Sequence, residues 1–245
     1  MKTELINLSN EGVTLTAYIL DSSTEMPNMN YRPAMLVIPG GGYNFCSDRE
    51  AEPVAMAFAA HGYNTFVLRY SIGKGKAAFP NPLNDAQEAL ELIINNSEKW
   101  HIDKSKTAAI GFSAGGHLCA ALSTLGRVRP AAAVLCYPCI LSSISDILAE
   151  PVPSVDEYVD DKTPPTFIVS SREDSCVPIE NSLRYADALE KAGVDFEMHI
   201  YSKGYHGFSL ANEVVFSQEE DYLYNSHLSG WFELCCAWLK KTFNS

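Results

Sequence analysis

Short apolar runs alternate with longer amphipathic stretches along most of the chain. Val13–Leu20 alternates between apolar and polar side chains, which predicts a half-exposed strand at the edge of a sheet. Asp195–Tyr201 alternates more weakly and is predicted as a further strand. Five other runs are continuous and rich in β-branched residues, which is typical of strands buried on both faces. These runs are Ala34–Ile38, Asn64–Arg69, Thr107–Phe112, Ala131–Tyr137 and Thr166–Ser171.

Helical spacing fills the stretches between and after these strands. Glu52–Ala60 carries a proline near its start, where proline is tolerated. Pro178–Ala192 has proline at the predicted first position and Gly193 at its C-terminal stop. The β–α alternation predicts an α/β fold, in which helices flank a mostly parallel, doubly wound sheet within one domain over residues 1–245. The other predicted helices are Leu83–Asn95, Ala114–Leu125 and Ser229–Thr242.

Two stretches fit this alternation poorly. Ser71–Pro82 is rich in glycine, lysine and proline, and Cys139–Pro165 is acidic and contains several prolines. Loops at the C-terminal ends of parallel strands usually build the functional site of such a sheet. We therefore expect both stretches to form walls of a substrate cleft, with no separate lid domain.

Composition and charge restrict the class of partner. Apolar residues make up 47 % of the 245 residues, enough for a sizeable core. The formal net charge is −12, which disfavours nucleic acid and anionic membranes and fits a small neutral substrate such as an ester. No apolar run is long enough to span a membrane, and no secretory signal opens the chain. Seven cysteines without a regular framework suggest the cytoplasm. The oligomeric state stays open, a homo-oligomer included.

The segment Gly111-Phe112-Ser113-Ala114-Gly115 matches the pattern G-x-S-x-G. In this pattern, serine occupies a sharp turn between a strand and a helix, where side chains at the two glycine positions would clash. A chance match occurs in roughly one chain in ten of this length. The predicted strand before Ser113 and the predicted helix after it make chance several-fold rarer. Ser113 is therefore the predicted nucleophile.

His206 is the predicted general base. In strand–turn–helix sites of this kind, the acid follows the serine along the chain and the histidine comes last. His206 lies in a loop after the last predicted strand, from which an imidazole can reach a hydroxyl above the sheet edge. The other histidines are less suitable: His61 and His101 precede the serine, His117 is expected to pack against the sheet, His199 lies in a strand, and His227 precedes the last helix.

The predicted acid follows the strand that precedes the histidine loop. Asp174 is the first choice and Glu173 the alternative, because both come directly after Thr166–Ser171. A carboxylate in this position orients the imidazole and stabilises its protonated form. The structural alternative is that Asp174 only caps the helix predicted from Pro178, although that spacing is long for a cap.

A glycine triplet follows the strand Ala34–Ile38, in the segment Pro39-Gly40-Gly41-Gly42-Tyr43. Backbone N–H groups of such a loop can stabilise the oxyanion that forms during acyl transfer. The predicted donors are Gly41, Gly42 and Ala114. A phosphate-binding loop is the alternative, but neither the dinucleotide pattern nor the P-loop pattern continues after Tyr43.

Some residues with possible chemistry are assigned to packing. Cys136 and Cys139 form a C-x-x-C pair, but the pair closes a strand instead of opening a helix, which argues against redox chemistry. No Cys/His cluster has zinc spacing, so we expect neither a metal nor a cofactor. Tyr43, Phe112 and Tyr137 are predicted to line the substrate pocket, although aromatic residues at such positions are as often plain core.

The chain resembles the α/β-hydrolase superfamily, in its esterase/lipase branch near acetyl-xylan-esterase-like and hormone-sensitive-lipase-like enzymes. The resemblance covers about residues 34–208. It implies a catalytic triad of Ser113, Asp174 and His206 with the oxyanion donors named above, and it implies short acyl esters, including acetylated sugars, as substrates. Many relatives have His-Gly-Gly-Gly where this chain has Pro39. The resemblance is carried by PGGGY (39–43), SDREAEPVA (47–55), LRYS (68–71), GFSAGGH (111–117), SREDSCVP (171–178) and YHGFSL (205–210).

These observations predict a metal-independent serine carboxylic-ester hydrolase that acts on small-molecule esters, such as short-chain acyl esters and acetylated xylo-oligosaccharides. Two alternatives stay open. A serine peptidase on the same fold would use the same three side chains, and a catalytically inactive binding module would keep the fold without the reaction.

Overall fold

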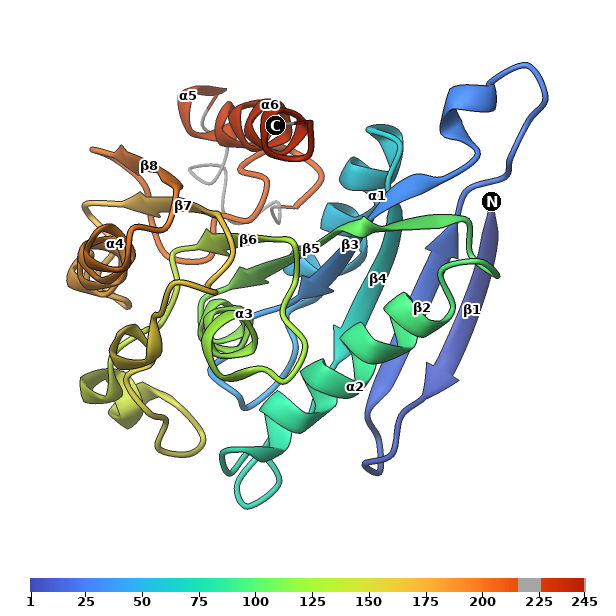
Figure 1. Cartoon of the computed structure of the whole chain (residues 1–245). Coiled ribbons are helices and arrows are strands. Elements are labelled where there is room, and N and C mark those ends of the chain that lie inside the picture. The colour runs from blue at the N-terminus through green and yellow to red at the C-terminus, as the bar shows by residue number, and fades with distance from the viewer. Residues whose placement is uncertain (216–225, 245) are drawn as a thin grey trace.

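The fold is built on one eight-stranded sheet in a computed structural model that describes residues 1–215 and 226–244. The strand order is β1-β2-β4-β3-β5-β6-β7-β8 (Figure 1). β2 is antiparallel to both of its neighbours, and the strands from β4 to β8 run parallel. The predicted α/β architecture is thereby confirmed. The strands are β1 (Lys2–Asn7), β2 (Thr14–Ile19), β3 (Arg32–Ile38), β4 (Asn64–Arg69), β5 (Ile102–Phe112), β6 (Ala132–Cys136), β7 (Thr166–Ser171) and β8 (Phe196–Tyr201).

Helices cover both faces of the sheet (Figure 1). α2 (Asn81–Asn95), α3 (Ala114–Leu125) and α4 (Glu180–Ala192) lie on one face. α1 (Glu52–Ala60), α5 (Ser226–Ser229) and α6 (Trp231–Thr242) lie on the other. Short 3-10 helices complete the connections: η1 (Pro27–Met29), η2 (Asp48–Glu50), η3 (Ser142–Ile147) and η4 (Val155–Tyr158).

The two faces of the sheet explain the continuous apolar runs. In β3, Leu36 joins the core cluster that includes Leu90 of α2 and Leu118 of α3. Its neighbour Val37 joins the opposite cluster, which includes Phe58 of α1. Successive side chains of a strand point to opposite faces, so a strand covered on both sides is apolar at most of its positions.

The outer edge of the sheet differs from the prediction. The prediction that Val13–Leu20 forms an edge strand is wrong, because β2 pairs with β4 on one side and with β1 on the other. β1 escaped prediction because five of its six residues are exposed and it buries no apolar face. It is held by backbone pairing from Lys2 opposite Ile19 to Asn7 opposite Thr14.

Helix boundaries follow the predicted signals with small shifts. α1 has the predicted bounds, and α4 ends at Gly193 in the left-handed conformation (φ 69°). α4 starts at Glu180, after Pro178, whose carbonyl accepts the Asn181 amide at 3.0 Å in the turn before the helix. No helix in residues 1–215 and 226–244 is both long enough and apolar enough to cross a membrane.

The parallel strands bring four distant segments to one edge of the sheet. Their C-terminal ends lie at the same side, as in other open α/β sheets. The glycine segment follows β3, and Ser113 follows β5. Asp174 follows β7, and His206 follows β8. Residues up to 166 positions apart in the sequence can therefore build one site.

Candidate active site

Ser113 lies on a strained turn between β5 and α3. Its backbone angles are φ 54° and ψ −119°, a region that residues other than glycine rarely adopt. Its N–H donates to the Cys136 carbonyl at 3.0 Å, and its carbonyl accepts the N–H groups of His117 and Cys139 at 3.0 Å each. Strain of this kind persists only where the surroundings fix it, and it is typical of functional sites.

Both glycines of the motif are sterically required. A Cβ atom at Gly111 would lie 2.1 Å from the Gly115 carbonyl oxygen. A Cβ atom at Gly115 would lie 2.2 Å from the Ile38 carbonyl oxygen. The neighbours are backbone atoms, which cannot turn aside as a flexible side chain can. The turn therefore packs directly on the end of β3, next to the glycine loop.

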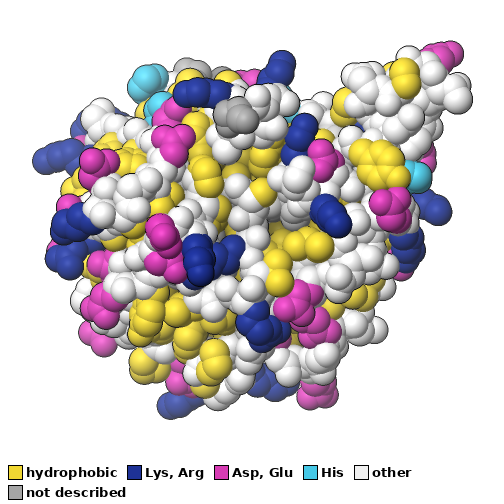
Figure 2. Space-filling view, viewed as in Figure 1, with side chains coloured by type: hydrophobic (Ala, Val, Ile, Leu, Met, Phe, Trp, Pro, Cys, Tyr) yellow, Lys and Arg dark blue, Asp and Glu magenta, His cyan; other side chains and the backbone are white. Residues whose placement is uncertain are grey.

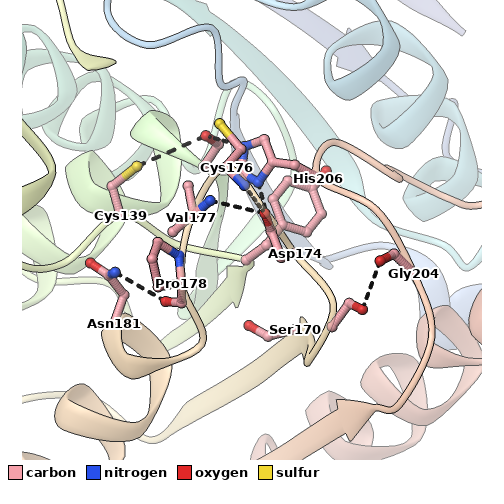
Figure 3. Close-up of polar contacts among 12 residues, drawn as sticks. Cys139, Ser170, Asp174, Cys176, Val177, Pro178, Asn181, Gly204 and His206 are labelled. Atoms are coloured by element: carbon pink, nitrogen blue, oxygen red, sulfur yellow. Dashed lines mark hydrogen bonds and ion pairs between the residues drawn. The ribbon is translucent and has the colours of Figure 1, made fainter. Parts of the chain in front are cut away.

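The structure brings the three predicted triad residues together. His206 Nε2 lies 2.7 Å from Ser113 Oγ. His206 Nδ1 lies 2.7 Å from Asp174 Oδ2 (Figure 3). With Nδ1 protonated, the ring donates to the carboxylate and accepts the serine hydroxyl at Nε2. The three side chains are thus arranged for transfer of a proton from the hydroxyl to the imidazole.

Asp174 uses its two oxygens differently. Oδ2 contacts the imidazole, while Oδ1 accepts the backbone N–H groups of Cys176 and Val177 at 2.9 Å each (Figure 3). The carboxylate therefore also fixes the turn before α4, although it does not cap that helix. Glu173, the alternative acid, instead pairs with Lys203 on the surface.

A cleft with a volume of about 330 Å³ opens above Ser113 and His206. Gly41 and Gly42, two of the three predicted oxyanion donors, line it, whereas the third, Ala114, is fully buried as the first residue of α3. Phe45 and Ile147 are apolar side chains on its walls with 57 % and 46 % of their surface exposed. The remaining lining residues are Asn44, Ser47, Arg49, Glu50, Leu148, Cys176 and Gly207.

One of the two predicted walls is correct. Ile147 and Leu148, from the stretch Cys139–Pro165, line the cleft. None of the cleft-lining residues belongs to Ser71–Pro82, so this expectation is wrong. That stretch instead supports the glycine loop from behind, where the Gly73 N–H donates to the Tyr43 carbonyl at 2.8 Å.

The prediction that Tyr43, Phe112 and Tyr137 line the pocket is wrong. Each side chain is at most 1 % exposed, and none of them lines the cleft. The physical reason is that they fill space beneath the loops. Phe112 packs against the rings of Trp231 and Tyr137, with centroids 6.5 and 5.9 Å apart. The ring of Tyr137 lies 5.1 Å from that of His206 and supports the imidazole from below.

His117 is buried, as expected, and its polar contacts are with loops. Its Nδ1 lies 2.8 Å from the Tyr43 hydroxyl, and its Nε2 lies 3.0 Å from the Pro153 carbonyl oxygen. Burial lowers the pKa of His117 to about 4. The ring is therefore neutral near pH 7, donating to Pro153 and accepting from Tyr43. It joins the glycine loop to the stretch that provides the opposite wall.

The cysteines of the C-x-x-C pair are free and buried. Cys139 Sγ lies 3.9 Å from Ser113 Oγ. Burial raises the pKa of the Cys139 thiol to about 12, which disfavours the reactive thiolate. Within the described part of the chain, no group of three or more His, Cys, Asp and Glu residues could hold a metal ion.

The sequence analysis missed the side chains that shape the cleft. Phe45, Arg49 and Glu50 follow the glycine triplet, and Ile147 and Cys176 come from two further loops. Arg49 and Glu50 lie in the segment SDREAEPVA, which contributes to the family resemblance. The place of these two charged residues in a segment that carries the resemblance was the available signal.

Family models match most of the chain in two consecutive parts. The BD-FAE family model matches residues 20–132, and the prolyl oligopeptidase family model matches residues 148–229. Among solved structures, an α/β-hydrolase enzyme from a Medee basin deep-sea metagenome library is 46 % identical with a TM-score of 0.94, covering 100 % of this chain and 99 % of that one. The chain therefore belongs to the α/β-hydrolase superfamily of hydrolytic enzymes, in its esterase/lipase branch.

Further relatives have more specific names. An acetyl ester-xyloside bifunctional hydrolase from Caldicellulosiruptor lactoaceticus is 37 % identical with a TM-score of 0.80, covering 96 % of this chain and 90 % of that one. The acetylxylan esterase of Xylanibacter ruminicola is 28 % identical over 84 % of this chain, and the endo-1,4-beta-xylanase B of Butyrivibrio fibrisolvens is 37 % identical over 76 %. The chain spans only 46 % and 34 % of the lengths of these last two proteins.

Proposed function

We propose that the chain is a serine carboxylic-ester hydrolase that removes short acyl groups, such as acetyl, from sugars. The observation that carries the proposal is the unbroken hydrogen-bonded chain from Ser113 through His206 to Asp174 at the floor of an open cleft. Two glycines of the neighbouring loop line the same cleft, where an oxyanion would form.

The reaction proceeds in two acyl transfers. Ser113 Oγ attacks the acyl carbonyl carbon while its proton moves to His206 Nε2. The backbone N–H groups of Gly41, Gly42 and Ala114 stabilise the oxyanion. The carbon–oxygen bond to the alcohol then breaks, and the alcohol leaves with the proton from His206. Water repeats the attack on the acyl-enzyme, again giving its proton to His206, and the free acid departs as Ser113 regains its hydrogen.

The shape of the cleft supports a short acyl group and a larger alcohol. Cys139 Sγ lies 3.9 Å from Ser113 Oγ, and Leu148 lines the same cleft. We propose that these two side chains restrict the acyl group to a short one. Phe45 and Ile147 present exposed apolar surface on the cleft walls, which suits the apolar face of a sugar ring. The names of the acetylxylan esterase and the acetyl ester-xyloside hydrolase agree with this substrate class.

An acyl-length series tests the proposal. We expect nitrophenyl acetate to be hydrolysed with a higher kcat/KM than the butyrate, and octanoate to be a poor substrate. Acetylated xylo-oligosaccharides should be deacetylated by the wild type and left intact by Ser113→Ala. Phe45→Ala should raise KM for the acetylated sugars more than for nitrophenyl acetate. A maximum at octanoate, or no release of acetate from sugars, would contradict the assignment.

A serine peptidase is the second candidate, favoured by the match of residues 148–229 to the prolyl oligopeptidase family. The same triad would serve both reactions, so the leaving group must distinguish them. We propose ester hydrolysis, with kcat/KM at least about 1000-fold higher for an acyl ester than for the matched acyl anilide or peptide. Comparable rates on peptide bonds would favour the peptidase.

A further inference from the structure

Glu50 is a buried carboxylate beside the triad that the hydrolytic mechanism does not use. It ends η2, and its side chain is part of the cleft floor while the residue is only 4 % exposed. Its Oε2 accepts the backbone N–H of Gly40 at 2.8 Å, and its Oε1 accepts the hydroxyl of Tyr137 at 2.7 Å. A charged group in such a position must be held by its partners, because burial without them is costly.

The two partners of Glu50 belong to different parts of the active site. Gly40 opens the glycine loop, and its carbonyl accepts the Ser47 N–H at 2.9 Å in the same turn. Tyr137 lies under His206, with ring centroids 5.1 Å apart, and its hydroxyl accepts the Ser209 N–H at 2.9 Å in the histidine loop. One carboxylate thereby connects the loop expected to hold the oxyanion with the loop that carries the base.

The hydrogen-bond directions indicate that Glu50 serves as an anion. The Tyr137 hydroxyl has one proton and already accepts from Ser209, so it donates that proton to Glu50. Both oxygens of Glu50 therefore act as acceptors. Burial has the largest influence and raises the pKa of Glu50 above its ordinary value, and the contacts with Tyr137 and Gly40 and the nearby His206 offset part of this rise.

Several charged and titratable groups surround the His206 imidazole. Asp174 contacts Nδ1 from the loop after β7, and Tyr137 faces the ring from the loop after β6. Arg49 and Glu50 come from η2, and Cys176 comes from the turn before α4. Glu50 lines the same cleft as His206, and the two side chains are close enough for His206 to lower the pKa of Glu50 by charge attraction.

We propose that Glu50 is a positioning residue that holds the glycine loop and the histidine loop together and that its negative charge stabilises the protonated His206 formed during each acyl transfer. The proposal rests on the proposed ester hydrolysis. It assigns Glu50 no contact with the substrate, since it acts through Gly40, Tyr137 and His206.

Glu50→Gln tests both parts. Gln has the shape of Glu but presents one NH2 group, so it either opposes the Gly40 N–H donor or removes the acceptor to which the Tyr137 hydroxyl donates. We expect kcat for nitrophenyl acetate to fall about 10- to 100-fold with KM changed less than about threefold. The acid limb of the kcat/KM pH profile, where His206 becomes protonated, should move to lower pH, because a negative charge that favours the protonated ring is lost.

Three further variants make the test specific. Tyr137→Phe keeps the ring beneath His206 and the charge of Glu50, so kcat should fall about tenfold without movement of the acid limb. Glu50→Asp keeps the charge but cannot reach both partners, so it should show the same fall in kcat as Tyr137→Phe with an unmoved acid limb. It tests the positioning role if Glu50→Gln does not fold. Glu52→Gln is the matched control in the same segment, where the carboxylate is exposed and accepts from Tyr18, and it should match the wild type.

Fluorophosphonate labelling of Ser113 separates this proposal from the proposed function. If the wild type hydrolyses no ester, the proposed function fails, while the pH dependence of labelling still reports on Glu50. A Glu50→Gln variant with wild-type rates would overturn the proposal. A loss of rate with an unmoved acid limb would overturn it as well, because a neutral structural support would give that result.

Discussion

At the scale of single residues, Asp174 performs two tasks with two atoms. Oδ2 holds the imidazole, and Oδ1 accepts two backbone N–H groups in the turn before α4. The backbone donors fix the carboxylate so that its other oxygen points at His206. Removing the negative charge therefore need not remove the turn.

Asp174→Asn should lower kcat about 10⁴-fold while the fold is kept. The amide oxygen can accept the two backbone donors at Oδ1, which places the NH2 group against His206. The ring must then accept at Nδ1 and carry its proton at Nε2, so it cannot accept the serine proton. Steady-state hydrolysis of nitrophenyl acetate measures the loss. Glu173→Gln, which changes only the surface pair with Lys203, should stay within about twofold of the wild type. A larger loss in Glu173→Gln than in Asp174→Asn would exchange the two assignments.

His117 should make stability depend on pH. Its pKa is about 4 in the folded chain, against an ordinary value of 6.5, because burial disfavours the charged ring. Between these values the unfolded chain binds more protons, so the free energy of unfolding falls as pH decreases, by about 3 kcal/mol in total. Above pH 6.5 the ring is neutral in both states and contributes no such dependence.

Urea unfolding at pH 7 and pH 4.5 measures this effect. His117→Gln should lose clearly less stability than the wild type between the two values. His199→Gln, at a partly exposed strand position beside Glu197, should keep the wild-type dependence. Equal losses in the wild type and His117→Gln would mean that the buried ring is not the source.

At the scale of elements, the turn between β5 and α3 depends on contact with the end of β3. Gly115 touches the backbone of Ile38 and Pro39 so closely that a methyl group has no space. α3 therefore starts directly beside the glycine loop, which places its N-terminus next to Ser113.

Gly115→Ala should destabilise the chain by more than about 3 kcal/mol, because a Cβ atom 2.2 Å from a carbonyl oxygen forces the helix away from β3. Gly193→Ala is the matched control. Unlike Gly115, Gly193 has a positive φ, and no atom lies within 4 Å of its missing Cβ, so the substitution should cost only about 1 kcal/mol. Thermal and urea unfolding compare the two. Similar losses would show that the close contact does not matter.

The elements that could be predicted are those with an apolar signal. Strands buried on both faces and helices with one apolar face leave a clear pattern, so β3–β7 and α1–α4 were recognised within a few residues, apart from an early start of β5. β1 has almost no buried face, and its pairing with β2 relies on backbone hydrogen bonds that no side-chain pattern records. The edge of the sheet was misplaced for that reason.

At the scale of the whole molecule, the parts of the site that leave a local sequence signal could be predicted, and the parts that depend on packing between distant loops could not. Ser113, Asp174 and His206 were found because their order in the chain and their strand ends are readable locally. Of the cleft walls, only the stretch Cys139–Pro165 was predicted correctly. The individual side chains Phe45, Ile147 and Cys176 were not identified, because they come together only through the packing of three loops. The buried aromatics Tyr43 and Tyr137 were misassigned, since proximity in sequence to a site does not reveal which way a ring points.

The surface charge agrees with a small neutral substrate. The net charge is −12, and on the face drawn in Figure 2 Lys and Arg side chains lie among Asp and Glu side chains. The described residues on this face form no continuous basic surface of the kind that binds nucleic acid (Figure 2).

The most direct test of the account is labelling of the whole chain with a fluorophosphonate, followed by mass spectrometry of the intact protein and its peptides. One equivalent should attach to Ser113 in the wild type, together with loss of esterase activity, and none should attach in Ser113→Ala. Labelling of another residue, or ester hydrolysis that survives in Ser113→Ala, would contradict the assignment of the nucleophile and with it the mechanism.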